Sequence, residues 1–280
     1  MKQQITRRTV LSGIAASALL PAAPRAGAAK KATAFALIGD RYHNSDYIRT
    51  ALRKTLVNEG GITIDFRDEV ELLNAEELKG YKLLIILRDG MLWPGGYLQG
   101  PPGSPNTPPP SIKSEPPFPK IDAQPFYWIT AEQGKAVKDF VSAGGGALFY
   151  HNVTYISPHN DDFRDVLGAV TEEHPPLRPF KVKVVNRDHP ITRGVNDFVV
   201  TDEQHFMTYQ KDPKCLLLQS VNEDGLTFKD LGTSSAAGWA YEYGKGRVCY
   251  MAPGHVITSL WNPEYVTLQK NAVRWLLKQS

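Results

Sequence analysis

The apolar run Leu83–Leu87 constrains the fold of this chain more than any other feature of its sequence. Its residues, Leu-Leu-Ile-Ile-Leu, predict a strand that is buried on both faces, which is typical of a parallel sheet covered by helices. Two further apolar runs, Ala34–Ile38 and Ala147–Tyr150, predict strands before and after it. Amphipathic segments separate the three strands. The order of elements therefore favours an α/β fold with a mostly parallel sheet flanked by helices.

Three helices are predicted from apolar spacing and capping residues. The first is capped by Asn44 or Ser45, carries apolar residues at helical spacing and ends before Gly60. The segment Thr130–Gln133 is a capping box, which predicts a helix that extends to about Val141. The last helix begins with Pro263 in its first turn.

The second half of the chain is richer in strands than the first. Additional strands are predicted over Ile62–Phe66, Phe180–Val185, Cys215–Val221, Ala236–Tyr241 and Arg247–Met251. The glycine-containing turn at residues 243–246 joins the last two strands, which predicts an antiparallel hairpin at one side of the sheet.

Residues 1–28 have the composition of an export signal. A basic start precedes the apolar run Val10–Ala23, and Ala26-Gly27-Ala28 resembles a cleavage site. The pair Arg7-Arg8 favours the twin-arginine route, and an ordinary secretory signal that contains two arginines is the alternative. The apolar run is too short to span a membrane, for which about 20 residues are needed. We therefore expect a periplasmic or secreted protein whose domain covers residues 29–280.

The charge balance excludes several classes of partner. The whole chain carries a formal charge of +3, and removing the four basic residues of 1–28 leaves a body of −1. Such a body has no long-range field to attract nucleic acid, so we expect no nucleic-acid partner. The chain has only two cysteines, too few for a disulfide scaffold. Cys215 and Cys249 are expected in the core, with a disulfide permitted only if their strands are neighbours.

A proline-rich insertion occupies about residues 94–125. Ten of the 21 prolines lie within 101–125, which excludes a helix or a central strand there. The insertion directly follows a predicted strand, and ligands of α/β sheets bind beyond the carboxyl ends of strands. It is therefore either an irregular surface insertion or a wall of the site. The nearby aromatic residues, which include Trp93 and Trp128, are candidates for stacking on sugar rings.

Polar residues gather where the predicted strands end. His43 follows the first strand, His151 follows Ala147–Tyr150, and His255 follows the last strand. The pair Asp202-Glu203 lies in a further polar cluster. Because parallel strands end at one edge, we expect these five residues to meet as a catalytic group. Other candidates for substrate binding from these clusters are Arg41, Ser45, Arg88, Asp89, Asn152 and His205.

Histidines and carboxylates together allow two kinds of chemistry. They can transfer protons near neutral pH, with Glu203 or Asp202 as the base. Alternatively, His43, His151, Glu203 and His255 can bind a divalent metal ion. The other histidines are less informative: His159 is a weaker candidate for the site, and His174 and His189 lie before prolines in predicted turns, where capping is the simpler role.

Several segments, in this order, are similar to motifs of the ThuA-like, or trehalose-utilisation, family. They are Arg41–Ser45, Gly144–His151, His189–Thr192, Thr201–Glu203, Tyr243–Tyr250 and Gly254-His255. The resemblance implies a class I glutamine amidotransferase-like, flavodoxin-like α/β fold without the amidotransferase cysteine. The positions that correspond to family motifs are His43, Ser45, His151, Asp202, Glu203 and His255. The bulkier Phe149 and Asn152, His205 in place of an aromatic residue, and the proline-rich insertion depart from the family pattern.

The resemblance implies a role in sugar catabolism, with trehalose-like disaccharides or keto-glycosides as substrates. An enzyme that cleaves or rearranges such a sugar is the first hypothesis. A saccharide-binding module without catalysis and a metal-dependent hydrolase are the alternatives.

Overall fold

The structure, a computed structural model, describes residues 31–95, 115–117 and 124–279. The predicted export signal at 1–28 and most of the proline-rich insertion at 94–125 lie outside the described residues. None of the helices in the described ranges has the length and apolar content to cross a membrane.

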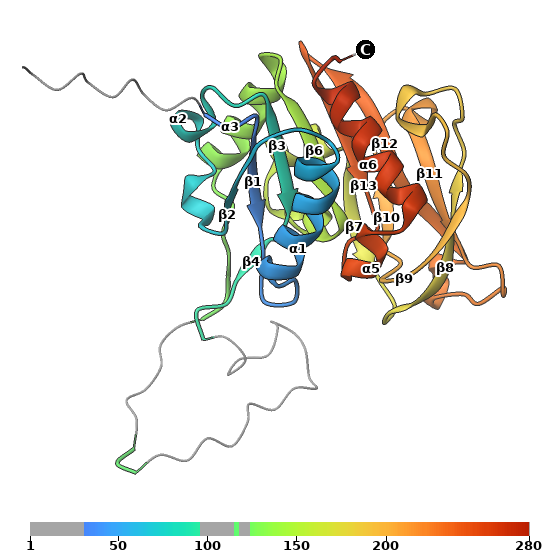
Figure 1. The fold of residues 1–280 in the computed structure, drawn as a ribbon. Helices are drawn as coiled ribbons and strands as arrows, with labels where there is room; N and C mark the ends of the chain where they lie inside the picture. The colour runs from blue at the N-terminus through green and yellow to red at the C-terminus, as the bar shows by residue number, and fades with distance from the viewer. Residues whose placement is uncertain (1–30, 96–114, 118–123, 280) are drawn as a thin grey trace, which may run out of the picture. The chain divides into compact units, whose positions relative to one another are not determined.

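A nine-stranded mixed sheet organises the domain (Figure 1). Its strands, in spatial order, are β2 (Ile64–Arg67), β1 (Ala34–Ile38), β3 (Leu83–Leu87), β6 (Gly146–Tyr150), β13 (Gly246–Met251), β12 (Ser234–Tyr243), β11 (Leu216–Val221), β8 (Arg178–Val184) and β9 (Phe198–Asp202). The first five strands pair in parallel, and every pairing from β13 to β9 is antiparallel. The α/β class predicted from the sequence is confirmed.

The parallel half has the buried strands that the apolar runs predict. All residues of β1, β3 and β6 are buried, because helices cover both faces of this part of the sheet. The antiparallel half alternates instead, and in β9 the buried residues are Phe198, Val200 and Asp202. Because of this alternation, no continuous apolar run marks β9 in the sequence.

The predicted hairpin is present, but it occupies a different place. Strands β12 and β13 pair in antiparallel register, from Gly238 opposite Met251 to Tyr243 opposite Gly246. The hairpin lies in the middle of the sheet rather than at one side, because β13 pairs in parallel with β6.

The two cysteines do not form a disulfide. Strand β12 separates β11, which follows Cys215, from β13, which contains Cys249, and both residues are free thiols.

Two small antiparallel pairs accompany the large sheet. Strand β7 (Ala169–Glu173) pairs with β10 (Phe206–Tyr209), and β4 (Met91–Leu92) pairs with β5 (Phe126–Tyr127). The second pair joins the two ends of the proline-rich insertion, so both ends lie beside the carboxyl end of β3.

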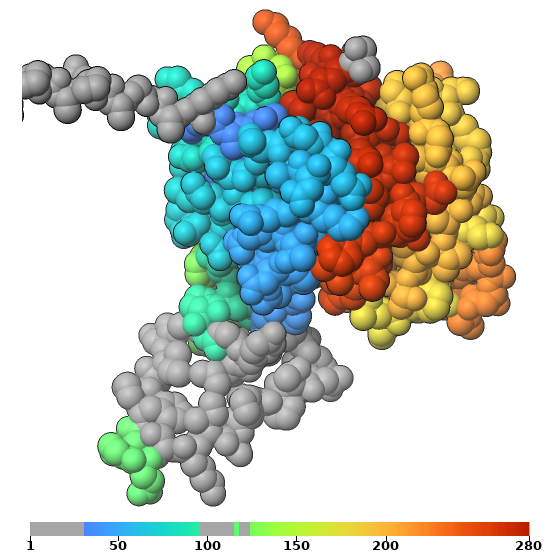
Figure 2. Space-filling view, viewed as in Figure 1, coloured from blue at the N-terminus to red at the C-terminus, as the bar shows by residue number. Residues whose placement is uncertain are grey.

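Helices cover both faces of the sheet. One face carries α1 (Ser45–Leu52), α5 (Ile257–Leu260) and α6 (Pro263–Leu276), which Figure 2 shows in blue and red. The other carries α2 (Ala75–Leu78), α3 (Ala131–Ser142) and α4 (Asp161–Leu167). Helix α3 begins with the predicted capping box, and α1 continues into a π-helical segment at Arg53–Asn58.

Candidate functional site

A cavity of about 570 Å³ lies at the edge where the parallel strands end. Its size is within the usual range of small-molecule sites, about 300–1,000 Å³. Residues that follow β1, β3, β6, β9 and β13 meet there, as the topology of a parallel sheet requires. The cavity is lined by Tyr42, His43, Asp89, Gly90, Met91, Trp93, Tyr127, Asn152, Tyr155, Pro158, His159, His174, Glu203 and His255.

The turn after β1 holds His43 in one orientation. The Asp40 carboxylate accepts hydrogen bonds from the backbone N–H groups of Tyr42 and His43 and from the His43 ring nitrogen Nδ1, at 2.8–2.9 Å. Asp40 also accepts hydrogen bonds from the side chain of Asn152, after β6, and from the backbone N–H of Asp89, after β3. It therefore links the ends of three strands. Because a carboxylate only accepts, Nδ1 of His43 carries the proton and Nε2 faces the cavity with its lone pair.

His151 occupies a strained turn between β6 and the short 3₁₀ segment that follows it. Its φ is +50°, a left-handed conformation that is uncommon for residues other than glycine and concentrates at functional sites. The ring nitrogen Nδ1 donates to the carbonyl oxygen of Ala252 at 2.9 Å. Gly254 is required beside it, because a Cβ there would lie 2.7 Å from Cβ of His151. The fully buried ring is thus locked with Nε2 directed towards Glu203.

Glu203 is the centre of the histidine cluster. Its oxygen Oε2 lies 3.0 Å from Nδ1 of His255, 3.4 Å from Nε2 of His151 and 3.6 Å from Nε2 of His205. Nε2 of His43 lies 2.9 Å from Nδ1 of His255, which links it to the same group. The side chains of Glu203 and His255 are 14% and 20% exposed, so they are the parts of the cluster that a molecule in the cavity would meet.

Asp202 supports the cluster from behind. It is fully buried and accepts hydrogen bonds from the backbone N–H groups of Glu203, Gly254 and His255 at 2.8–3.2 Å. These bonds hold the turn after β13 against the end of β9. The sequence places Asp202 among the catalytic candidates, whereas the structure places it outside the cavity lining as a residue that positions Glu203 and His255.

The carboxylates of the cluster favour ionisation. Burial raises the pKa of Glu203, but the close contacts with His151, His205 and His255 outweigh it and hold this pKa far below its usual value. Burial likewise opposes the ionisation of Asp40, and its bonds with His43 and Asn152 lower its pKa to about 2. Both groups are therefore anions at neutral pH.

The surroundings shift the pKa values of the histidines in opposite directions. Burial lowers the pKa of His43 below its usual value despite the neighbouring Asp40, and burial together with the nearby His151 lowers that of His205. Burial also opposes the charge on His151, but Glu203 and Asp202 outweigh it and raise its pKa. The cluster therefore combines a neutral His43 with a His151 that attracts a proton or another positive charge.

Asp89 is the carboxyl group in the cavity that retains a proton most easily. Burial, followed by the negative charge of Asp40, raises its pKa to about 7. Its oxygen Oδ1 accepts a hydrogen bond from the backbone of Met91 at 2.8 Å. A carboxyl group with a pKa near the working pH can serve as an acid or a base in a reaction.

Aromatic side chains form the outer wall of the cavity. The ring of Tyr42 packs edge-on against Trp93, and the guanidinium of Arg41 lies 4.4 Å from the Trp93 ring centre. Tyr127 stacks on His159 with the ring centres 3.3 Å apart. Such exposed rings provide flat apolar surfaces for the faces of a bound ligand.

Several predicted binding residues lie outside the cavity lining. Arg88 donates to the carbonyl oxygens of Gly39 and Asp68, and Trp128 is buried with its indole N–H donating to the carbonyl of Asp89. Ser45 packs against Gly39, where a Cβ would lie 2.0 Å from its hydroxyl oxygen. Arg88 and Ser45 instead line a separate hollow with Arg41.

His205 is buried behind Glu203, stacked on His174. The remaining predicted residues, His43, Asp89, Trp93, Asn152, Glu203 and His255, line the cavity, and His151 contacts it through Glu203.

Sequence reasoning missed several residues of the site, and three of them show why. Asp40 follows Gly39 at the end of β1, three residues before His43, and this spacing is a signal for the turn that it caps. His174 lines the cavity rather than only closing a turn, and its placement depends on the unpredicted strand β7. Tyr155 belongs to the 3₁₀ segment after β6 and had no sequence signal. His189, by contrast, caps a 3₁₀ turn as predicted, accepting from the backbone of Ile191.

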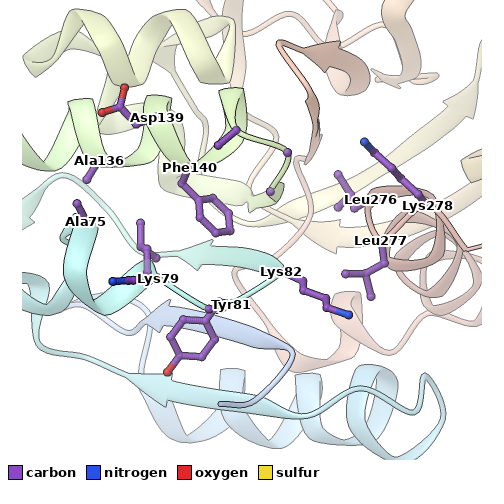
Figure 3. A pocket seen from close by; sticks show the side chains of 15 residues that line it. Ala75, Lys79, Tyr81, Lys82, Ala136, Asp139, Phe140, Leu276, Leu277 and Lys278 are labelled. Atoms are coloured by element: carbon purple, nitrogen blue, oxygen red, sulfur yellow. The ribbon is translucent and has the colours of Figure 1, made fainter. Parts of the chain in front are cut away.

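A second hollow, of about 470 Å³, lies at the opposite, amino edge of the parallel strands (Figure 3). Its charged residues are Lys79, Lys82, Lys278 and Asp139, and Asp139 forms an ion pair with Lys135. No histidine is among the described residues that line it. The candidate chemistry is therefore concentrated at the carboxyl edge.

Comparisons with known proteins agree on the fold. A family model described as trehalose utilisation (ThuA) matches residues 122–276. A ThuA-like protein from Parabacteroides merdae has a TM-score of 0.62 at 14% identity, and one from Bacteroides uniformis has 0.58 at 19%. Each alignment covers 87% of this chain and 89% of the other. A β-galactosidase from Rahnella aligns at a TM-score of 0.52 and 15% identity over 89% of this chain but only 32% of its own. No curated protein matches the chain.

Proposed function

This chain belongs to the trehalose-utilisation (ThuA) family, and we propose that it is an enzyme of sugar catabolism that acts on trehalose-like disaccharides or keto-glycosides. The observation that carries the proposal is the convergence of His43, His151, Glu203 and His255 at a cavity of ligand size. Buried titratable groups with shifted pKa values, gathered in one cavity, are typical of an active site.

The residues of the cavity support acid–base chemistry on a sugar. Glu203 is ionised and partly exposed to the cavity, so it is placed to accept a hydrogen bond from a sugar hydroxyl and to stabilise positive charge that develops on the sugar. Asp89 lines the same cavity with a pKa of about 7, so it can donate a proton near neutral pH. We assign the two carboxyl groups these complementary roles, with the histidines orienting Glu203.

The test is turnover of a panel of disaccharides, including trehalose, and their 3-keto forms. We expect product from at least one sugar and a loss of about a hundredfold or more in kcat for E203Q. E242Q is the matched control, because Glu242 is an exposed glutamate on β12 and remote from the cavity lining. Unchanged turnover in a folded E203Q protein would refute the proposal.

Saccharide binding without catalysis is the alternative function, and the aromatic wall of the cavity favours it. Tyr42, Trp93 and Tyr127 offer stacking surfaces whether or not a reaction follows. The same panel separates the two functions: a binding module would show saturable binding by calorimetry and no product after long incubation.

We also propose that the protein is exported to the periplasm or beyond. Support comes from the basic and apolar pattern of residues 1–28 and the Arg7-Arg8 pair. Cell fractionation tests the proposal, with the double substitution Arg7→Lys and Arg8→Lys as the probe of the twin-arginine route. Retention of that variant in the cytoplasm supports this route, and normal export supports an ordinary secretory signal.

A further inference from the structure

Four ligand atoms converge at the inner end of the cavity. They come from His43, His151, Glu203 and His255, and all lie within 4.8 Å of one another. Four ligands of a tetrahedral metal ion, each about 2.0–2.2 Å from it, are separated by roughly 3.3–3.6 Å. Three of the six separations within the group, 2.9 Å, 3.0 Å and 3.4 Å, lie close to this range, and the others do not exceed 4.8 Å.

In two of the histidines, the hydrogen bond made by Nδ1 leaves the lone pair of Nε2 directed at the other residues of the group. Nδ1 of His43 donates to the Asp40 carboxylate, and Nδ1 of His151 donates to the Ala252 carbonyl. Each bond leaves Nε2 of a neutral ring as a lone pair that faces the cluster. Histidines that bind metals are held in this way, by a carboxylate or a backbone carbonyl on the opposite nitrogen.

An unpaired group indicates that a positive charge belongs between these residues. Nε2 of the fully buried His151 makes no hydrogen bond within the described residues, and it faces the anionic Glu203 at 3.4 Å. A lone pair and a carboxylate repel each other in a buried site unless a cation lies between them. A metal ion would bind the lone pairs of His151 and His43 and the carboxylate of Glu203 at the same time. A proton on His151 would bridge only the contact between His151 and Glu203.

We propose that His43, His151, Glu203 and His255 bind one divalent transition-metal ion. Three imidazoles and one carboxylate match the preferences of Zn²⁺ and its neighbours rather than those of Mg²⁺ or Ca²⁺, which favour oxygen ligands. The inference rests on the proposed function, because it names the cofactor of the same site. With the metal bound, Glu203 is a ligand, and the ion supplies Lewis-acid chemistry to a sugar oxygen in the cavity.

A second group, His174, Glu203 and His205, is less suited to a metal ion. In His174 the nitrogen that faces Glu203 is Nδ1, at 3.7 Å, and the same atom lies 3.0 Å from the carbonyl oxygen of Pro175. Unlike in His151, the nitrogen directed at the group is therefore the one that carries the proton. Glu203 is shared by both groups. We therefore assign one ion per chain to the first group.

The experiment counts metal bound to the untagged protein. After chelation and dialysis, the protein is titrated with Zn²⁺ and with Co²⁺, and bound metal is measured by elemental analysis and by the Co²⁺ absorption spectrum. We expect one ion per chain and a loss of affinity of at least tenfold in H255A and in E203Q. His159→Ala is the matched control, because His159 lines the same cavity outside the group and should leave binding unchanged.

The outcomes separate this inference from the proposed function. Stoichiometric metal binding without turnover supports the metal site and refutes the proposal that the protein is an enzyme. Turnover by a protein that binds neither ion stoichiometrically refutes the metal site and leaves the enzyme standing. Equal losses of metal affinity in H255A and H159A, or no stoichiometric binding of either ion, also overturn the inference. Melting curves identify any variant that fails to fold, and H255A is the safest of them because its side chain is partly exposed.

Discussion

The carboxylate of Asp40 and the imidazole of His43 form a buried pair at the end of β1, with Nδ1 lying 2.8 Å and 3.0 Å from the two carboxylate oxygens. The same carboxylate bonds to Asn152 after β6 and to the backbone of Asp89 after β3. Asp40 therefore fixes the direction of one imidazole and the relative positions of three strand ends.

Replacing Asp40 by asparagine should disturb the site more than the fold. Among the described residues, every hydrogen-bond partner of the Asp40 carboxylate is a donor, so an amide NH₂ group would face other donors. We expect D40N to lower kcat/KM about 10- to 100-fold, and to cost about 1–3 kcal/mol of stability. Steady-state kinetics and urea unfolding measure the two effects. The control is D46N, at an exposed aspartate of α1, which should change neither.

Asp89 should set the alkaline limb of the pH–rate profile. Its pKa of about 7 results from burial and the charge of Asp40, so the carboxyl group is protonated below pH 7 and ionised above it. If it donates a proton, kcat/KM is constant below pH 7 and falls about tenfold per pH unit above it. D89N should be slow at all pH values and lack this limb, and D68N, at an exposed aspartate, should retain it. A wild-type profile that is flat from pH 6 to 9 contradicts the assignment.

Tyr127 should contribute to binding and its neighbour Phe126 should not. The two side chains lie on β5 and are about equally exposed, 49% and 50%, but only Tyr127 lines the cavity. Loss of a stacking ring that contacts the ground state and the transition state equally raises KM and leaves kcat unchanged. We expect Y127A to raise KM, or the Kd of a bound saccharide, about three- to tenfold, which corresponds to about 0.5–1.5 kcal/mol. Equal effects of Y127A and F126A would indicate that the wall is not a sugar surface.

Asp165 should make stability depend on pH below neutrality. Burial opposes its ionisation, but Lys211, Tyr243 and Lys138 outweigh it and lower its pKa from 3.8 to about 2. A lowered pKa means that the ionised group stabilises the fold above about pH 4, and that this contribution is lost as the pH falls towards 2.

The measurement is urea unfolding of D165N and the wild-type protein between pH 7 and pH 2.5. Because the Asp165 side chain is 44% exposed, solvent screening limits the effect at pH 7 to about 1 kcal/mol or less. The difference between the two proteins should shrink as the pH falls from 4. A difference that stays constant, or one reproduced by D188N at an exposed aspartate, contradicts the interpretation.

The parts of the site that could be predicted follow from the topology of parallel strands. His43, His151 and His255 lie far apart in the sequence, yet each follows a buried apolar strand. Their ring centres lie 4.6–5.6 Å apart in the structure. Apolar runs identify such strands, and the rule that parallel strands end at one edge brings their next residues together.

The parts that could not be predicted depend on side-chain direction and on weakly patterned strands. Asp202 shares the buried face of β9 with Phe198 and Val200, and two of the three backbone N–H groups that make this burial possible belong to a turn distant in the sequence. Arg88 directly follows β3 as a site residue would, but its guanidinium bonds to backbone carbonyls instead. Such outcomes depend on partners that are remote in the sequence, and no local pattern contains them.

Strand β13 is one of the last segments of the chain, yet it pairs with β6 on one side and β12 on the other, in the interior of the sheet. Until residues 246–251 have docked, the edge of β6 that faces β13 therefore has no strand partner. We therefore expect refolding of the denatured chain to compete with association through this strand edge until β13 has docked.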